Sequence, residues 1–231
     1  MKNNHIKNFI KCGYLNNFIL SIISNYKYIN NLELDYIILY YIKKINCKSA
    51  TINYNNYKFS SCLSIENVIC HGIPYKKKYI YFLKIDISII FKKLYSDNCY
   101  NNNFLFKKKN FFFKKNYFNI LNLIKINNNI TIDYKKNKNI FINKEYCSHG
   151  IFKKLHNKLI IYHCNNNKKN KLFNTFTIEP MFIFFSKKGY LYKNIFFTKN
   201  NNFSFQWEHT LFNFKKKIIL TTIRKNELCF L

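Results

Sequence analysis

The spacing of apolar residues predicts two helices at the start of the chain. Over the first 23 positions, apolar side chains recur every three or four residues, which is the period of an amphipathic helix. This stripe is formed by Ile6, Phe9, Ile10, Tyr14, Phe18, Ile19, Ile22 and Ile23. A second helix is expected to start after Asn31, with Glu33 and Asp35 in its first turn and Lys43 and Lys44 in its last. These charges complement the helix dipole. We interpret both apolar stripes as core packing.

A different period, with alternating polar and apolar residues, follows the helices. Residues 51–70 are interpreted as short strands and turns, and residues 79–91 as a longer strand. In the longer strand Lys84, Asp86 and Ser88 alternate with apolar residues, which places the three polar side chains on one face. The Lys/Asn/Phe-rich stretch 98–116 predicts a loop that enters a helix. That helix would carry Tyr117, Ile120, Leu121 and Ile124.

The last third of the chain is strand-like. We expect strands within 176–185, 203–211 and 217–223, and exposed connections at the Asn-Lys clusters near 135–139 and 165–171. Helices followed by strands thus occur twice. The pattern predicts one α+β domain over residues 1–231, built from two related halves of about 1–100 and 101–231.

Composition changes how the charge is interpreted. The formal net charge is +29, but the 39 basic residues include a single arginine, Arg224, and alanine and valine also occur once each. This usage is typical of an AT-biased genome. Lysines spread along the chain, without the arginines that bind phosphate in a bidentate manner, argue against a dedicated nucleic-acid function. Loose electrostatic attachment to ribosomal RNA stays open.

The cysteines and the apolar runs bear on the compartment. Eight cysteines form no CxxC pair, so a zinc finger is not supported and reduced thiols are the simpler interpretation. The first ten residues lack the apolar stretch of a secretory signal, and the apolar run at 34–42 is too short to span a membrane. We expect a soluble, cytoplasmic protein with no membrane contact. The alternative is an organelle of an AT-rich lineage.

Three carboxylates fall within apolar, strand-like segments: Asp86, Glu179 and Glu208. A buried carboxylate costs several kcal/mol unless it is paired, protonated or bound to metal. Each alone could instead pair with one of the many lysines. Together with Asp97 and His149, however, they make an oxygen-rich ligand set that suits two divalent cations.

Six segments resemble the signature segments of methionine aminopeptidases and occur in the family's order. They are CHGIP (70–74), KIDIS (84–88), SDN (96–98), EYCSHGI (145–151), FTIEPM (176–181) and QWEHT (206–210). The first predicted helix and the segment leading into CHGIP also resemble the family, so that the likeness covers nearly the whole chain. The short stretch between His149 and Glu179 leaves no room for the helical insertion of type II enzymes, which favours type I.

The resemblance implies a fold and a set of metal ligands. The fold is the "pita-bread" fold, in which two pseudo-symmetric α+β halves surround a central, curved antiparallel sheet with a metal centre between them. By similarity Asp86 binds one cation, and His149 with Glu179 binds the other. Asp97 and Glu208 would bridge both. The native metal is left open among Co, Mn, Fe and Zn.

The resemblance also implies a reaction: removal of the N-terminal methionine from nascent polypeptides when the second residue is small. A hydroxide activated by two metals would attack the carbonyl, with Glu179 as proton acceptor. His156 would stabilise the tetrahedral intermediate, and His71 would contact substrate and assist the leaving amine. The methionine pocket would be walled by Tyr54, Tyr57, Cys62 and Met181, with Phe196 or Phe197 as a lid. His5, His163 and His209 are given no catalytic role.

Some positions depart from the family pattern. Ser96 and Ser148 replace glycines, and residues 152–154 are FKK where a Gly/Arg-rich turn is usual. These departures concern turn geometry and rate. Two alternative functions stay open: a related peptidase that cuts before proline or acts on dipeptides, and a non-catalytic or weakly active pita-bread module associated with the ribosome. A monomer with transient ribosome contact is expected.

Overall fold

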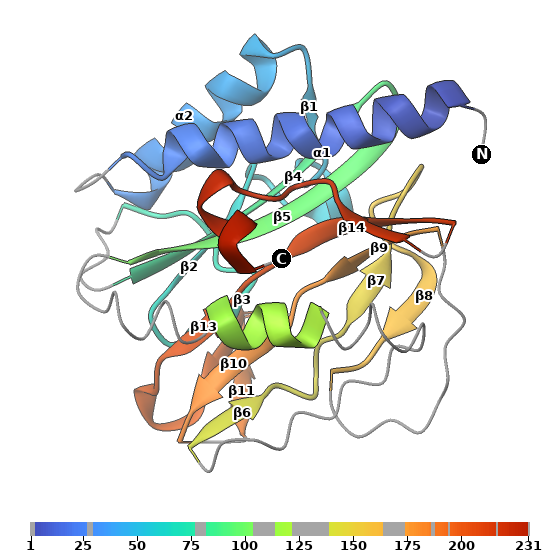
Figure 1. Ribbon diagram of the computed structural model, residues 1–231. Helices are drawn as coiled ribbons and strands as arrows, with labels where there is room; N and C mark the ends of the chain where they lie inside the picture. Colours follow the sequence, from blue (N-terminus) through green and yellow to red (C-terminus); the bar gives the residue numbers. More distant parts are fainter. Residues whose placement is uncertain are drawn as a thin grey trace.

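The computed structural model describes residues 3–26, 30–76, 82–103, 114–121, 139–163, 174–185, 188–193, 195–215 and 217–230. Two long helices, α1 (Asn3–Ile23) and α2 (Asn31–Lys44), lie together along one side of the molecule (Figure 1). A shorter helix covers residues 114–121. Short 3-10 helices are η1 (Tyr54–Asn56), η2 (Lys199–Asn201) and η3 (Lys225–Phe230).

The helices α1 and α2 pack against a sheet built from the first half of the chain. Its strands are β1 (Lys48–Ser49), β2 (Cys62–Ile65), β4 (Phe82–Phe91) and β5 (Leu94–Asn103). β4 is central and pairs antiparallel with each of the other three. α1 packs across β4 and β5, and at Gly13 it approaches Thr221 so closely that an added Cβ would lie 2.3 Å from Thr221 Oγ1.

The second half of the chain supplies a five-stranded sheet in the order β15-β14-β9-β7-β8. Its strands are β7 (Ser148–Gly150), β8 (Asn157–Ile161), β9 (Thr175–Ile178), β14 (His209–Phe214) and β15 (Lys217–Leu220). A smaller sheet joins β6 (Ile140–Ile142), β10 (Met181–Phe184) and β13 (Ser204–Gln206). Another joins β3 (Val68–Cys70), β11 (Gly189–Tyr192) and β12 (Ile195–Thr198). All described pairings are antiparallel, so the predicted α+β class is confirmed.

Two large apolar clusters form the core. One packs the N-terminal helices against β2 and β4, and the other packs the helix at 114–121 against β9, β10 and β14. Each cluster belongs to one of the two expected halves of the sequence. The boundary near residue 100 and the pseudo-symmetry of the halves stay predictions.

The buried face of α1 differs from the predicted stripe. Tyr14 and Phe18 are 63% and 43% exposed, although both were expected to pack in the core. Cys12, Gly13 and Asn16 are buried instead. Asn16 Nδ2 donates hydrogen bonds to two β-strand carbonyls, of Ile87 at 2.8 Å and Ser96 at 3.0 Å. The middle of the helix therefore buries small and polar side chains between the apolar residues Phe9 and Ile19, which hydrophobic spacing alone does not reveal. α2 begins at Asn31, with Asn30 as its N-cap.

The predicted loop at 98–116 is wrong over its first part. Residues 98–103 continue β5, which pairs with β4 over all ten rungs from Phe82↔Asn103 to Phe91↔Leu94. Asparagine disfavours strands, but pairing with a central strand overrides that preference. Residues 104–113, Ile124 and the cluster at 165–171 lie outside the described residues, as does most of 135–139. The predicted helix near Tyr117 is confirmed over 114–121.

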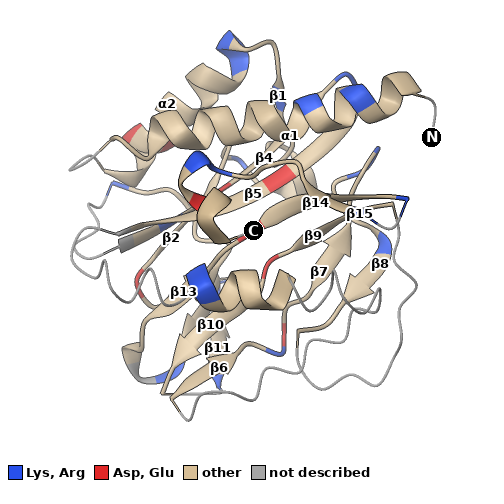
Figure 2. Cartoon of the chain, viewed as in Figure 1, with Lys and Arg blue, Asp and Glu red and all other residues tan. Residues whose placement is uncertain are grey.

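Lysine and arginine are carried by many separate elements (Figure 2). None of the described helices is both long enough and apolar enough to cross a membrane.

Candidate metal centre

Two neighbouring strands of the first half bring Asp86 and Asp97 together. Asp86 in β4 lies opposite Cys99, and Asp97 in β5 lies opposite Ser88, so the two carboxyls stand two rungs apart on one face of the same ladder. They lie close enough to share a hydrogen bond. Ser88 Oγ donates to Asp97 Oδ1 at 2.8 Å, and this bond fixes one carboxylate oxygen.

The second half contributes His149 in β7, together with Glu179 and Glu208. His149 Nε2 lies 3.3 Å from Glu179 Oε1 and 3.9 Å from Asp97 Oδ2. The ligand atoms of Asp97, His149 and Glu208 all lie within 4.8 Å of one another. Residues from distant parts of the sequence therefore converge at one point between the two halves.

The two glutamates lie at breaks between strands. Glu179 follows β9, where the chain leaves the five-stranded sheet to enter β10, and Glu208 precedes β14, where the chain returns from β13. β9 pairs with β14 through Ile178↔His209, and β10 pairs with β13 through Met181↔Gln206. The two breaks therefore face each other. The sequence predicted strands within 176–185 and 203–211 without locating these breaks. The interruption lets both carboxylates leave the ladders and turn toward Asp97.

The electrostatics of the apoprotein are unfavourable to four ionised carboxylates. Burial, and then the charges of the neighbouring carboxylates, raise the pKa of Asp86, Glu179 and Glu208 well above the ordinary value. Burial also raises the pKa of Asp97, although hydrogen bonds from Ser88 and Asn98 oppose it. Glu208 Oε1 is buried and has no hydrogen-bond partner among the described residues. Such crowded, underbonded oxygens fit the requirements of a divalent cation.

His149 is held as a neutral ring. Burial is the main cause that lowers its pKa to about 3, which leaves a lone pair free to bind metal. Its Nδ1 lies 3.1 Å from the carbonyl oxygen of Gly150, which orients Nε2 toward the carboxylates.

A second set of hydrogen bonds holds Glu179. Thr177 Oγ1 donates to Glu179 Oε1 at 3.0 Å, and Glu179 N donates to Ser148 Oγ at 2.8 Å. Ser148 Oγ also lies 2.6 Å from Nε2 of the buried His163. The serine that departs from the expected glycine thus joins two strands behind the site. His163, to which the sequence assigned no catalytic role, is a partner of Ser148 and not a ligand in the cluster.

Two further histidines were predicted to serve catalysis. The His156 ring centroid lies 4.2 Å from that of His149, and Tyr54 Oη lies 2.6 Å from His156 Nδ1. Tyr54 therefore orients a histidine, a contact that its predicted role as a pocket wall did not include. His71 is exposed, and its ring centroid lies 5.3 Å from that of Tyr146.

The remaining predicted pocket residues form two adjoining groups. Cys62 pairs with Asp86 across the sheet and shares a hydrogen bond with Tyr57. Met181 packs in a small apolar cluster with Cys70, against which Tyr146 and Phe196 also pack. Phe197 instead stacks on Tyr190, with ring centroids 5.6 Å apart. Sequence reasoning missed Tyr146, although it lies within the EYCSHGI segment.

Known proteins include clear sequence relatives of this chain, although no family model matches it. The methionine aminopeptidase of Buchnera aphidicola subsp. Baizongia pistaciae is 31% identical over 217 residues, covering 81% of this chain and 78% of that protein. That of Buchnera aphidicola subsp. Schizaphis graminum is 29% identical over 233 residues, covering 90% and 88%.

Solved structures similar to this fold include methionine aminopeptidases. The crystal structure of a methionine aminopeptidase from Thermotoga maritima superposes with a TM-score of 0.84 at 18% identity, covering 97% of this chain and 98% of that one. The expected pita-bread fold is therefore confirmed. On the strength of its sequence relatives, and in agreement with its fold, this chain belongs to the methionine aminopeptidase family.

Proposed function

We propose that the chain removes the N-terminal methionine from nascent polypeptides whose second residue is small, with two divalent cations at the candidate metal centre. One observation carries this proposal: ligand atoms of Asp97, His149 and Glu208 lie within 4.8 Å of one another. The family supports a metal-dependent exopeptidase. We propose two cations per chain, drawn from Co, Mn, Fe and Zn.

The five candidate ligands divide the work by position. Asp86 would hold one cation, His149 and Glu179 the other, and Asp97 and Glu208 both. When bound, the cations supply Lewis acidity, which polarises the scissile carbonyl and lowers the pKa of water. The complete set of candidate ligands argues against the non-catalytic alternative. Four carboxylates buried together destabilise the fold unless a cation binds them, and a protein that binds no metal has no use for such an arrangement.

The protein's own groups handle the proton and the substrate. Glu179 accepts the proton that the attacking water loses, since its Oε1 lies at the cluster beside His149 Nε2. His156, oriented by Tyr54, donates a hydrogen bond to the oxygen on which charge develops. His71 contacts the substrate and assists proton transfer to the departing amine.

The methionine side chain would pack beside the candidate ligands. Tyr57, Cys62 and Met181 would line it, and a thioether packs well against such aromatic and sulfur-containing side chains. Phe196 is the better candidate for the lid, because it packs with Met181 and Tyr146, whereas Phe197 stacks on Tyr190. Transient ribosome contact through surface lysines and a monomeric state complete the proposal.

A comparison of three tripeptide substrates tests the function. With added Co²⁺ or Mn²⁺, we expect kcat/KM for Met-Ala-Ser to exceed that for Met-Leu-Ser and Ala-Pro-Ser by at least ~100-fold, because a closed pocket rejects a large second residue or a different first one. The released amino acid, methionine from the two Met peptides and alanine from Ala-Pro-Ser, is quantified by chromatography, and EDTA-treated protein is the control. Equal or faster release from Ala-Pro-Ser would instead assign the chain to the proline-directed peptidases.

A further inference from the structure

The single arginine of the chain is buried behind the metal centre. Composition favours lysine over arginine almost everywhere, yet Arg224 stands at a position that is only 5% exposed. A lysine there would keep the charge, but it would lose the planar guanidinium that donates in several fixed directions. We therefore expect that this position needs the fixed donor directions of a guanidinium in addition to its positive charge.

Its ionic partner is Glu227, which is completely buried. Arg224 Nε donates to Glu227 Oε1 at 3.0 Å, and Arg224 N donates to Glu227 Oε2 at 2.9 Å. Burial alone would raise the pKa of Glu227, but Arg224 and then His209 lower it well below the ordinary value. The carboxylate is thus a fixed, charged acceptor.

Glu227 holds both neighbours of the ligand Glu208. Trp207 Nε1 donates to Glu227 Oε1 at 3.0 Å, and His209 Nε2 lies 3.2 Å from Glu227 Oε2. His209 Nδ1 in turn lies 2.9 Å from Thr222 Oγ1. Glu208 therefore sits between two residues anchored to one carboxylate, which restricts the direction in which its own side chain leaves the backbone.

Arg224 reaches the strand that carries the other central ligand. Its Nη1 donates to Asn98 Oδ1 at 3.0 Å, and its Nη2 donates to the Cys99 carbonyl oxygen at 2.8 Å. Asn98 N donates to Asp97 Oδ1 at 3.1 Å, and Glu208 N donates to the same Cys99 carbonyl at 3.2 Å. One guanidinium thereby links the backbone of β5 to the segment before β14.

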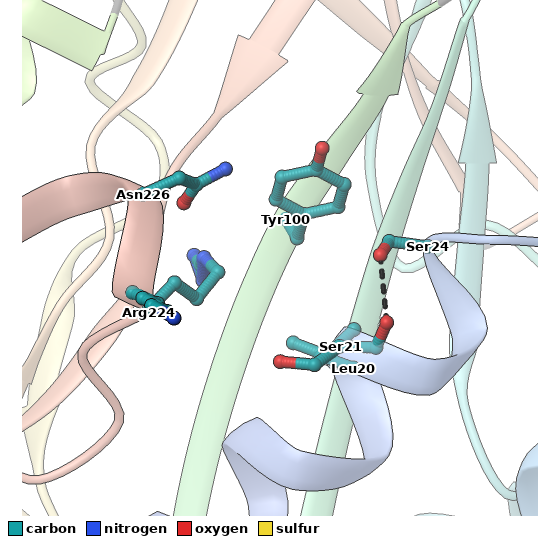
Figure 3. A pocket seen from close by; sticks show the side chains of 7 residues that line it. Leu20, Ser21, Ser24, Tyr100, Arg224 and Asn226 are labelled. Carbon is teal, nitrogen blue, oxygen red and sulfur yellow. Dashed lines mark hydrogen bonds between the residues drawn. The ribbon is translucent and has the colours of Figure 1, made fainter.

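Figure 3 shows Arg224 extending from the start of η3 beside the ring of Tyr100, with its guanidinium carbon 5.2 Å from the ring centroid. The same side chain lines a cavity together with Leu20, Ser21, Ser24, Tyr100, Lys225 and Asn226. A small cation in this cavity could occupy the space that a truncated Arg224 would leave.

We propose that the Arg224–Glu227 pair is a positioning device that fixes Asp97 and Glu208 relative to each other and thereby sets the affinity and geometry of the metal centre. This inference rests on the proposed function, because it assigns a purpose to the spacing of two proposed bridging ligands. Neither residue belongs to the proposed metal ligands or to the proposed substrate contacts. Both act through their hydrogen-bond partners.

Anaerobic titration of the apoproteins with Co²⁺, followed by visible absorption, tests the inference. We expect Arg224→Lys to weaken Co²⁺ binding at least tenfold and to shift the absorption bands, because the carboxylates change their separation. Trp207→Phe, which removes one donor to Glu227 and keeps an aromatic ring, should act in the same direction with a smaller effect. In Arg224→Ala, ~10 mM guanidinium should restore part of the lost affinity, since the cavity gives access to the vacated space.

The control is Ile38→Val, a core change in α2 remote from the site. It should lower the melting temperature and leave Co²⁺ affinity and spectrum unchanged. Wild-type affinity and spectrum in both Arg224→Lys and Trp207→Phe would overturn the inference, and if Arg224→Lys does not fold, Trp207→Phe decides alone. A wild-type protein that binds no Co²⁺ would overturn the proposed function as well, so the two failures are distinguishable.

Discussion

Glu179→Gln is expected to lower kcat for Met-Ala-Ser by about 10²–10⁴-fold, the usual contribution of a general base. Glutamine keeps the size of the side chain and can still meet Thr177, but it neither accepts a proton nor supplies a charged ligand oxygen to the cluster beside His149. The change is measured as single-turnover release of methionine at saturating Co²⁺.

The matched control is Glu145→Gln, because Glu145 is an exposed carboxylate only a few residues before His149, the proposed ligand. It makes the same chemical change and should leave kcat within about twofold of the wild type. If Glu179→Gln retains wild-type turnover, Glu179 has no part in the proton transfer.

Glu208→Gln is expected to abolish high-affinity metal binding and, at the same time, to stabilise the apoprotein at pH 8. Burial and the charges of Asp97, Glu179 and Asp86 raise the pKa of Glu208 well above the ordinary value. Between the ordinary and the raised pKa, the native state binds more protons than the unfolded state, so the free energy of unfolding falls as pH rises through this window. Glutamine removes this penalty. Each tenfold difference in proton affinity between the native and unfolded states corresponds to a gain of about 1.4 kcal/mol, or roughly 3–6 °C in melting temperature for a chain of this size.

The pH dependence of this gain provides the check. The difference in melting temperature between Glu208→Gln and wild-type apoprotein should be largest at pH 8 and should shrink toward zero as pH falls toward the ordinary glutamate value. Titrating groups that do not face Glu208, such as Lys84 with its lowered pKa of about 7, are common to both proteins and cancel. Added Co²⁺ should reverse the order, since only the wild type gains binding energy. A Glu208→Gln apoprotein that melts below the wild type at pH 8 would contradict this account.

The candidate site was largely predictable because acidic residues are scarce in this chain. Ten Asp and Glu stand among 231 residues, so Asp86, Glu179 and Glu208 were conspicuous in apolar segments. Asp97 and His149 completed an oxygen-rich ligand set, and the motif resemblance supported that set. Their actual convergence could not be deduced from alternation alone, because Glu179 and Glu208 leave their strands at breaks that the sequence pattern did not show.

Other features depend on tertiary contacts that carry no local signal. Asn98 to Asn103 form a strand because β4 offers them a full ladder, against their own preference. Cys12 and Asn16 turn toward the sheet, and Gly13 toward Thr221, because hydrogen bonding and close approach replace bulky apolar packing there. The pairing of Arg224 with Glu227 was equally hidden, although the solitary arginine was itself a clue.

The central claim is that two cations are held between the halves by Asp86, Asp97, His149, Glu179 and Glu208. Anomalous diffraction from crystals grown with Co²⁺, recorded at the cobalt absorption edge, tests it most directly. The account predicts two strong peaks among these five side chains, with Asp97 and Glu208 contacting both. The absence of any peak among them in a metal-replete crystal, or peaks only elsewhere on the protein, would contradict it.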